Sequence, residues 1–137
     1  MIVLDASALV ELTLATPAGN LIADRIADPA ESLNAPHLAD VEVLQALRRY
    51  LRLGVIDLPR ARAALADLRD FDIARHPHEP LLERVWELRD NLTAYDAVYV
   101  ALAEALEAML LTCDGPLSRT PALAGRALLI PLTSTPA

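Results

Sequence analysis

Two aspartates follow directly on short apolar segments that have the pattern of buried strands. They are Asp5, after residues 2–4, and Asp114, after residues 109–113. Ligands of an open parallel sheet bind outside the carboxyl ends of its strands, so acids at these positions could face a ligand. Each aspartate taken alone is better explained as the cap of a following helix. The nearby hydroxyl residues Ser7 and Thr112 make the pair more informative, because they could orient a carboxylate or a metal-bound water.

Asp96 lies at the start of a predicted helix and has two possible roles. It is the fourth residue of a Thr-x-x-Asp pattern that begins at Thr93, and this pattern is typical of a capping box. Asp96 also borders the apolar stripe expected to face the core, which consists of Tyr95, Val98, Leu102 and Leu106. From spacing alone, helix capping and a functional role are equally supported.

Glu42 is the weakest candidate when only helical spacing is considered. It shares a helix face with Gln45 and Arg49, whereas the apolar residues of the same segment lie mostly elsewhere. This arrangement favours a solvated face with an ion pair within the helix.

A cluster of four carboxylates requires shared protons or a bound cation, because like charges a few ångströms apart repel one another. Oxygen ligands without histidine or thiolate partners favour Mg²⁺ or Mn²⁺ over zinc. His37, His76 and His78 have no metal-ligand spacing with the acids and are predicted to lie on the surface or in loops. No histidine pattern would activate Cys113, which is predicted to be a buried thiol.

The composition excludes several other chemistries. All twelve basic residues are arginine, so the chain has neither the lysine of a phosphate-binding P-loop nor an amine for Schiff-base catalysis. The net charge of −7 argues against general adhesion to nucleic acid or anionic lipid. It does not exclude a nucleic-acid substrate, because a bound cation or a local arginine cluster can reverse the field. The single cysteine, the short apolar runs and the lack of a basic leader predict a cytoplasmic protein without a membrane span.

The elements that must position these residues alternate between apolar strands and amphipathic helices. This order predicts one α/β domain over residues 1–137, with a mainly parallel sheet flanked by helices. Strands are expected at residues 2–4, 32–35, 71–74, 109–112 and 127–130. Helices are expected at residues 7–14, from Pro17 to Pro29, from Pro36 to 53, and at 60–70, 80–89 and 93–108. The tail from Pro131 is expected to be frayed or to lie at an edge.

Four segments of the chain resemble the PIN-domain ribonucleases and, more narrowly, the VapC-type toxins of toxin–antitoxin pairs. They are residues 2–10, 35–49, 92–103 and 110–117, and the resemblance extends from Met1 to about residue 130 in the family's order. It implies a PIN-like fold whose metal-binding acids correspond to Asp5, Glu42, Asp96 and Asp114. The resemblance therefore reverses the interpretation of Glu42 that spacing favours. Some relatives have a further acid after the last aspartate, where this chain has Gly115 and Pro116, so a fifth ligand is missing.

The function implied by the resemblance is hydrolysis of RNA phosphodiester bonds by a Mg²⁺-dependent endoribonuclease, with Mn²⁺ as an alternative cation. A water activated by the metal would leave 5′-phosphate and 3′-hydroxyl ends. Asp5 and Asp96 would bind the metal directly. Asp114 and Glu42 would bind it directly or through water and would receive the proton of the attacking water.

The implied partners are RNA, a second copy of the chain in a homodimer, and a small antitoxin that blocks the active site. The apolar residues Leu53, Val55, Ile56 and Leu58 could form such protein contacts or belong to the core. Arginine suits phosphate because its guanidinium can bind two oxygens at once. The arginines close in sequence to the candidate acids are Arg48, Arg49, Arg52 and Arg119.

Three other interpretations remain open. A non-catalytic PIN-fold module would bind RNA or protein without cutting, although the presence of all four acids argues against it. An unrelated Mg²⁺-dependent phosphohydrolase or nucleotide-binding domain is disfavoured by the missing lysine and the missing glycine-rich phosphate loop. DNA in place of RNA is a third alternative, because the catalytic centre hardly senses the 2′-hydroxyl.

Overall fold

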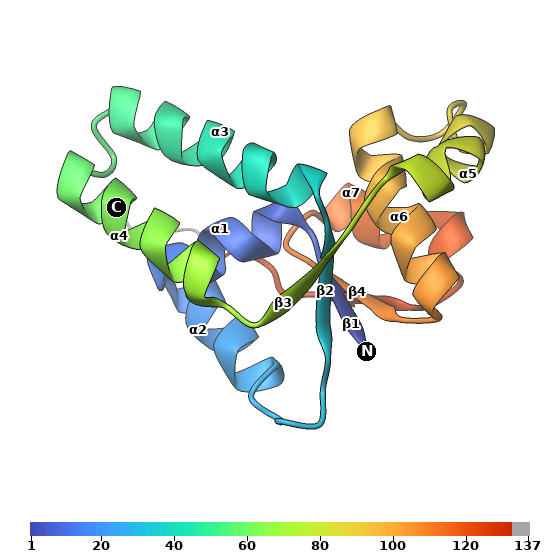
Figure 1. Ribbon diagram of the computed structural model, residues 1–137, viewed down its shortest axis with the longest axis horizontal. Coiled ribbons are helices and arrows are strands. Elements are labelled where there is room, and N and C mark those ends of the chain that lie inside the picture. The colour runs from blue at the N-terminus through green and yellow to red at the C-terminus, as the bar shows by residue number, and fades with distance from the viewer. Residues whose placement is uncertain (133–137) are drawn as a thin grey trace.

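A five-stranded parallel sheet forms the centre of the computed structural model, which describes residues 1–132 (Figure 1). The strands are β1 (Ile2–Leu4), β2 (Leu33–Pro36), β3 (Ile73–His76), β4 (Met109–Thr112) and β5 (Ala127–Leu129). They lie in the order β3-β2-β1-β4-β5, and every pairing is parallel. The expected α/β fold with a central parallel sheet is therefore confirmed.

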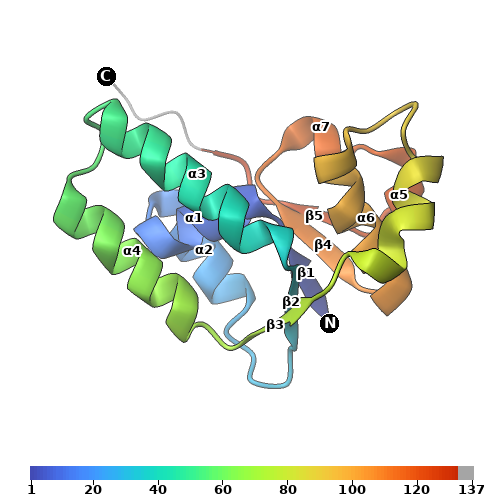
Figure 2. The same ribbon diagram turned by 45° about the horizontal axis from the view of Figure 1, so that its top comes forward.

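Helices cover both sides of this sheet. The first group is α1 (Ala6–Leu14), α2 (Pro17–Arg25), α3 (Leu38–Arg52) and α4 (Leu58–Asp70). The second group is the 3₁₀ turn η1 (Glu79–Leu81), α5 (Leu82–Glu87), α6 (Ala94–Leu106), α7 (Gly115–Ser118) and the 3₁₀ turn η2 (Pro121–Leu123). Figures 1 and 2 both show α1 to α4 packed together on one side and α5 to α7 on the other.

The strand order places β1 and β4 at the point where the direction of chain winding reverses. From β1 the chain builds β2 and then β3 on one side, and it returns to add β4 and β5 on the other. In the register of β1 with β4, Leu4 pairs with Leu111, so the two strands end beside each other. Such a switch point is where open α/β sheets bind ligands, and Asp5 and Asp114 follow the two strands that flank it.

The middle of α6 is buried on every side, which the expected apolar stripe did not anticipate. Residues 97–103 are all buried because α6 contacts β1, β2, β4, α5 and η2. The expected core position Tyr95 precedes this covered stretch and is 63% exposed, so that expectation is wrong. Tyr99, which is outside the expected stripe, is 2% exposed.

Several expected boundaries are wrong for local reasons. The third strand begins at Ile73 and not at residue 71, because α4 continues to Asp70 and the Phe71 N–H still donates to the Asp67 carbonyl. Pro36 ends β2 and does not open the following helix. The helix expected at residues 80–89 is divided into η1 and α5 and ends at Glu87. The expectation for the tail concerns mostly residues 133–137, which are outside the described part of the chain.

The junction of α1 and α2 depends on a glycine. The chain bends by 106° between the two helices, and a Cβ atom at Gly19 would lie 2.0 Å from the Glu11 carbonyl oxygen. Only glycine lets the two backbones approach this closely. Within residues 1–132 no single helix is both long and apolar enough to cross a bilayer, and the bent pair α1 and α2 meets that criterion only when the two are combined.

The α3–α4 hairpin carries apolar side chains into solvent. Of the four apolar residues between α3 and the start of α4, Leu53 is 69% exposed, Val55 67% and Leu58 51%, whereas Ile56 packs against the core. A groove of about 170 Å³ runs between the two helices, and its apolar lining consists of Leu44, Leu47, Leu51, Leu58, Ala61 and Leu65. The hairpin therefore offers an apolar surface that the described residues leave uncovered.

Candidate metal centre

Asp5 combines a structural role with a position at the switch point. It caps α1 by accepting a hydrogen bond from the Ala8 N–H at 2.9 Å, and its Oδ1 also accepts one from Ser7 Oγ at 2.7 Å. Its Oδ2 accepts a hydrogen bond from Thr112 Oγ1 at 2.5 Å. The side chain is 4% exposed, and the carboxylate is therefore fixed by three donors in a buried setting.

The predicted hydroxyl residues connect the ends of β1 and β4. Thr112 Oγ1 donates to Asp5 and accepts a hydrogen bond from the Asp114 N–H at 2.9 Å. Ser7 Oγ accepts one from the Cys113 N–H at 3.0 Å and lies 3.3 Å from Thr112 Oγ1. These contacts confirm that both hydroxyl groups orient an acid at this edge of the sheet.

Asp114 and Asp96 line one hollow, whereas Ser7 and Glu42 line another. Asp114 caps α7, because its Oδ1 accepts a hydrogen bond from the Leu117 N–H at 3.0 Å. The Thr93 hydroxyl accepts from the Asp96 N–H at 3.1 Å, so one half of the expected capping box forms. The Thr93 side chain also interacts with the Asp96 carboxylate and lowers its pKa, so the link between the two residues is not limited to the Asp96 N–H.

Glu42 is held by a residue that the sequence interpretation missed. Tyr99 Oη donates a hydrogen bond to Glu42 Oε1 at 2.8 Å, from α6 to α3. The expected ion pair between Glu42 and Arg49 does not form within the described residues; instead the Arg49 guanidinium lies 5.4 Å from the centre of the Tyr50 ring. Tyr99 lies three residues after Asp96 and therefore on the same helix face. This spacing is the sequence signal that could have identified Tyr99.

The electrostatics of the four acids show that they influence one another. Burial is the main cause that raises the pKa of Asp5 to about 6, and the charge of Asp114 adds to it. Burial also raises the pKa values of Asp96 and Glu42; Asp114 contributes further to the first and Asp96 to the second. Each of the four carboxylates therefore lies within electrostatic range of at least one other.

The oxygen ligands available at this site suit a hard cation, but their arrangement is too open to enclose one. The available ligands are carboxylate and hydroxyl oxygens, which Mg²⁺ and Mn²⁺ prefer. Within residues 1–132, no three His, Cys, Asp or Glu side chains lie close enough together to enclose a metal ion. A cation would have to draw the carboxylates inward.

Two hollows flank the acids. The first, of about 410 Å³, includes Ser7, Glu42, Gln45 and Arg49 among its lining residues. The second, of about 450 Å³, includes Thr93, Asp96, Asp114 and Arg119. Asp5 is hydrogen-bonded to Ser7 of the first hollow and, through Thr112, is linked to Asp114 of the second. The acidic centre therefore lies between two spaces that open to solvent.

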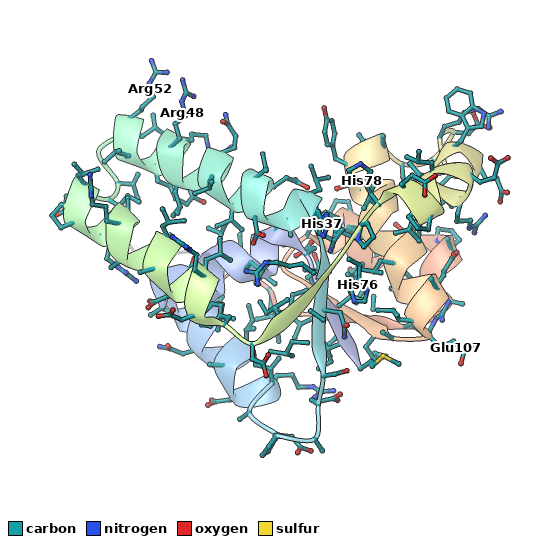
Figure 3. The ribbon with its side chains drawn as sticks, in the orientation of Figure 1. His37, Arg48, Arg52, His76, His78 and Glu107 are labelled. Atoms are coloured by element: carbon teal, nitrogen blue, oxygen red, sulfur yellow. The ribbon has the colours of Figure 1, made fainter. Side chains whose placement is uncertain are left out.

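The other candidate residues lie mostly as expected. His37 and His78 are exposed, whereas His76 is in β3 and its Nε2 makes a 2.8 Å hydrogen bond with Asn34, so His76 is not a loop residue (Figure 3). Cys113 is buried, as expected, and burial raises its pKa to about 12, which makes its thiol a poor nucleophile.

We expect the free energy of unfolding, measured in a chelator, to fall as the pH rises from about 4 to above 6. The pKa of Asp5 is about 6 in the folded protein against an ordinary value of 3.8, so the folded state binds the proton more tightly. At lower pH Asp5 is protonated in both the folded and the unfolded state, so it makes no pH-dependent contribution to the free energy of unfolding. At higher pH the folded state carries a buried Asp5 charge, which lowers the free energy of unfolding by on the order of 3 kcal/mol.

Urea unfolding of the Asp5→Asn variant should show a weaker dependence on pH over this interval. Asparagine can keep the bonds from Ala8 and Ser7, and its amide can donate to Thr112. The exposed Asp72→Asn variant serves as the control and should retain the parent slope. An equal slope for Asp5→Asn and its parent would contradict the assignment of the raised pKa to Asp5.

Comparison with known proteins agrees with this fold. The family model of the PIN domain matches residues 2–123. Ribonuclease VapC9 of Mycobacterium tuberculosis is 48% identical over 124 residues, which cover 88% of this chain and 91% of that protein. The structure of PAE2754 from Pyrobaculum aerophilum is 28% identical, with a TM-score of 0.71 over 92% of this chain and 81% of that one. A toxin–antitoxin complex from Klebsiella pneumoniae contains a chain with the same fold, at 18% identity and a TM-score of 0.64 over 93% of this chain and 96% of that one.

The fold and the candidate site together define a class of protein. It is an α/β domain with carboxylates at the switch point of its parallel sheet. The chain belongs to the PIN-domain family, in its VapC-type branch.

Proposed function

We propose that this protein is a metal-dependent endoribonuclease and the toxin component of a toxin–antitoxin pair. The observation that supports this most directly is the fixed, buried carboxylate of Asp5 between Ser7 and Thr112, at the switch point and within electrostatic range of a second acid. The ribonuclease names of relatives such as VapC9 agree with it.

The four acids would together bind Mg²⁺ or Mn²⁺. A bound cation of this kind supplies Lewis-acid chemistry, because it lowers the pKa of water and offsets the charge of the scissile phosphate. Asp5 and Asp96 are proposed as direct ligands. Asp5 contributes an oriented oxygen, and Asp96 contributes a partly buried carboxylate in the first turn of α6.

Glu42 and Asp114 would complete the site from its two sides, directly or through water. The raised pKa of Glu42 favours acceptance of a proton, which is the role proposed for it during attack by water. The Asp114 carboxylate is directed by its bond to the Leu117 N–H.

Incubation of purified protein with total RNA tests the proposal. Mg²⁺ should produce fragments with 5′-phosphate and 3′-hydroxyl ends, and a chelator should stop their formation. A single-stranded DNA substrate is included in the same assay. Absence of cleavage with Mg²⁺ and with Mn²⁺ would favour the non-catalytic binding module, and equal cleavage of DNA would contradict selectivity for RNA.

Tyr99→Phe is expected to lower metal-dependent RNA cleavage about tenfold at limiting Mg²⁺. The variant keeps the buried ring but removes the hydroxyl that holds Glu42. The Mg²⁺ concentration at half-maximal rate should rise, because Glu42 is less well positioned. Tyr95→Phe is the matched control, since Tyr95 is 63% exposed on the same helix. An unchanged Mg²⁺ requirement in Tyr99→Phe would show that this bond is only structural.

The exposed surface of the α3–α4 hairpin is proposed as a protein contact, for the antitoxin and for a homodimer in the cytoplasm. The protein product of a small adjacent reading frame should suppress RNA cleavage. Loss of this suppression in a Leu51→Asp variant would support the antitoxin contact. Sedimentation of the chain alone tests the dimer. A monomer whose activity no such product suppresses would contradict both contacts.

A further inference from the structure

Most of the twelve arginines are occupied or lie away from the candidate metal centre. Arg75 and Arg84 form ion pairs, and Arg60, Arg89 and Arg126 donate to backbone carbonyls. Arg48 and Arg52 extend into solvent from the far end of α3 (Figure 3). Within residues 1–132, two arginines line a hollow that also contains a candidate acid, and these are Arg49 and Arg119.

These two arginines line different hollows. Arg49 is in the first hollow with Glu42 and Ser7, and Arg119 is in the second hollow with Asp96 and Asp114. Both side chains are exposed, and within the described residues neither forms an ion pair with a carboxylate. Each guanidinium is therefore available to an anion in its hollow.

Each guanidinium lies against a neighbouring group. Arg49 lies over the ring of Tyr50, 5.4 Å from its centre. Arg119 folds back on the start of α7, where a Cβ at Gly115 would lie 3.1 Å from its Nη1. A side chain at position 115 would therefore contact the Arg119 guanidinium, and glycine leaves this space open.

Charge and size indicate what these hollows accept. Each has a volume within the range of about 300–1,000 Å³ that is usual for small-ligand pockets. Both combine an arginine with polar side chains, so they match an anion that carries a polar group, such as one nucleotide of a single strand. A negatively charged protein needs such local positive sites to bring a polyanion to an acidic centre.

We infer that Arg49 and Arg119 bind the phosphates on either side of the cleaved one, so that a single RNA strand passes from the first hollow over Asp5 into the second. This inference rests on the proposed function, since it places the scissile phosphate at the acids.

Binding is measured with a fluorescent single-stranded oligoribonucleotide in the non-cleaving Asp5→Asn background. Arg49→Gln and Arg119→Gln should each weaken binding about tenfold at low salt. Each should lower the slope of log K against log salt by about 0.7, which is the effect of one lost phosphate contact with a single strand. Arg52→Gln and Arg25→Gln remove the same charge from exposed sites outside the hollows and should leave the slope unchanged. Equal effects in all four variants would overturn the inference in favour of a general charge effect.

The phosphate contacts of Arg49 and Arg119 are distinguished with a substrate whose cleavage site is mapped and in which single phosphates are neutralised as methylphosphonates. Neutralising the phosphate 5′ of the cleaved one should no longer affect cleavage by one of the two arginine variants. Neutralising the phosphate 3′ of it should no longer affect cleavage by the other. Loss of this pairing while the parent still cleaves would refute the strand path and leave the proposed function intact. Failure of the parent to cleave would instead refute the proposed function.

Discussion

Asparagine in place of Asp5 is expected to lower RNA cleavage more than about 100-fold while the protein stays folded. Loss of a residue that merely supports a metal ligand usually costs about 10- to 100-fold in metal affinity or activity, so loss of a ligand should cost more. The amide keeps the shape of the side chain and its bonds to the Ala8 N–H and Ser7 Oγ, but it lacks the negative charge that a cation requires. Initial rates at saturating Mg²⁺, with circular dichroism to confirm folding, measure the effect.

Asp96→Asn provides the complementary comparison for this result. The Asp96 carboxylate is only partly buried and the Thr93 side chain is its one hydrogen-bond partner among residues 1–132, so its replacement should reduce activity with little change in the free energy of unfolding. The exposed Asp72→Asn variant should cleave like the parent. Full activity of a folded Asp5→Asn protein would remove Asp5 from the catalytic centre and with it the proposed mechanism.

Gly19→Ala is expected to destabilise the fold more than alanine at any other glycine of the chain. The added carbon would lie 2.0 Å from the Glu11 carbonyl oxygen and 2.6 Å from its carbon, and backbone atoms cannot move aside as a side chain can. Overpacking of this kind costs about 3 kcal/mol or more, because α1 and α2 must separate to relieve it.

Gly54→Ala is the matched control for this prediction. Gly54 has a φ of 73° and nothing within 4 Å of a new Cβ, so only its left-handed backbone opposes alanine. The cost there should be about 1 kcal/mol. Urea unfolding of both variants measures the difference, and similar losses would show that the contact between α1 and α2 is more yielding than its geometry indicates.

The sequence predicted those parts of the site that depend on local order. Asp5 and Asp114 were found because an acid directly after a buried strand is visible in the chain itself, and Ser7 and Thr112 were found beside them. The parallel sheet was predicted because buried strands alternate with helices. In each case the informative residues are close together in sequence.

The parts that could not be predicted depend on contacts between distant segments. The periodicity of α3 describes only its own faces, so it could not show that Glu42 meets Tyr99, 57 residues away. Only the resemblance identified Glu42 as a candidate site residue. The exposure of Tyr95 and the burial of Tyr99 have the same origin, because the neighbours of α6 come from β1, β2 and β4.

The hydrogen bond between Thr112 and Asp5 joins residues 107 positions apart, and this has a consequence for synthesis. A nascent chain that has not yet reached β4 lacks Thr112 and Asp114, and its central strand β1 has only one of its two neighbours. Domains are made from the N-terminus onward, so the acidic centre is completed late in translation. During most of its synthesis, the polypeptide would therefore lack a complete acidic centre.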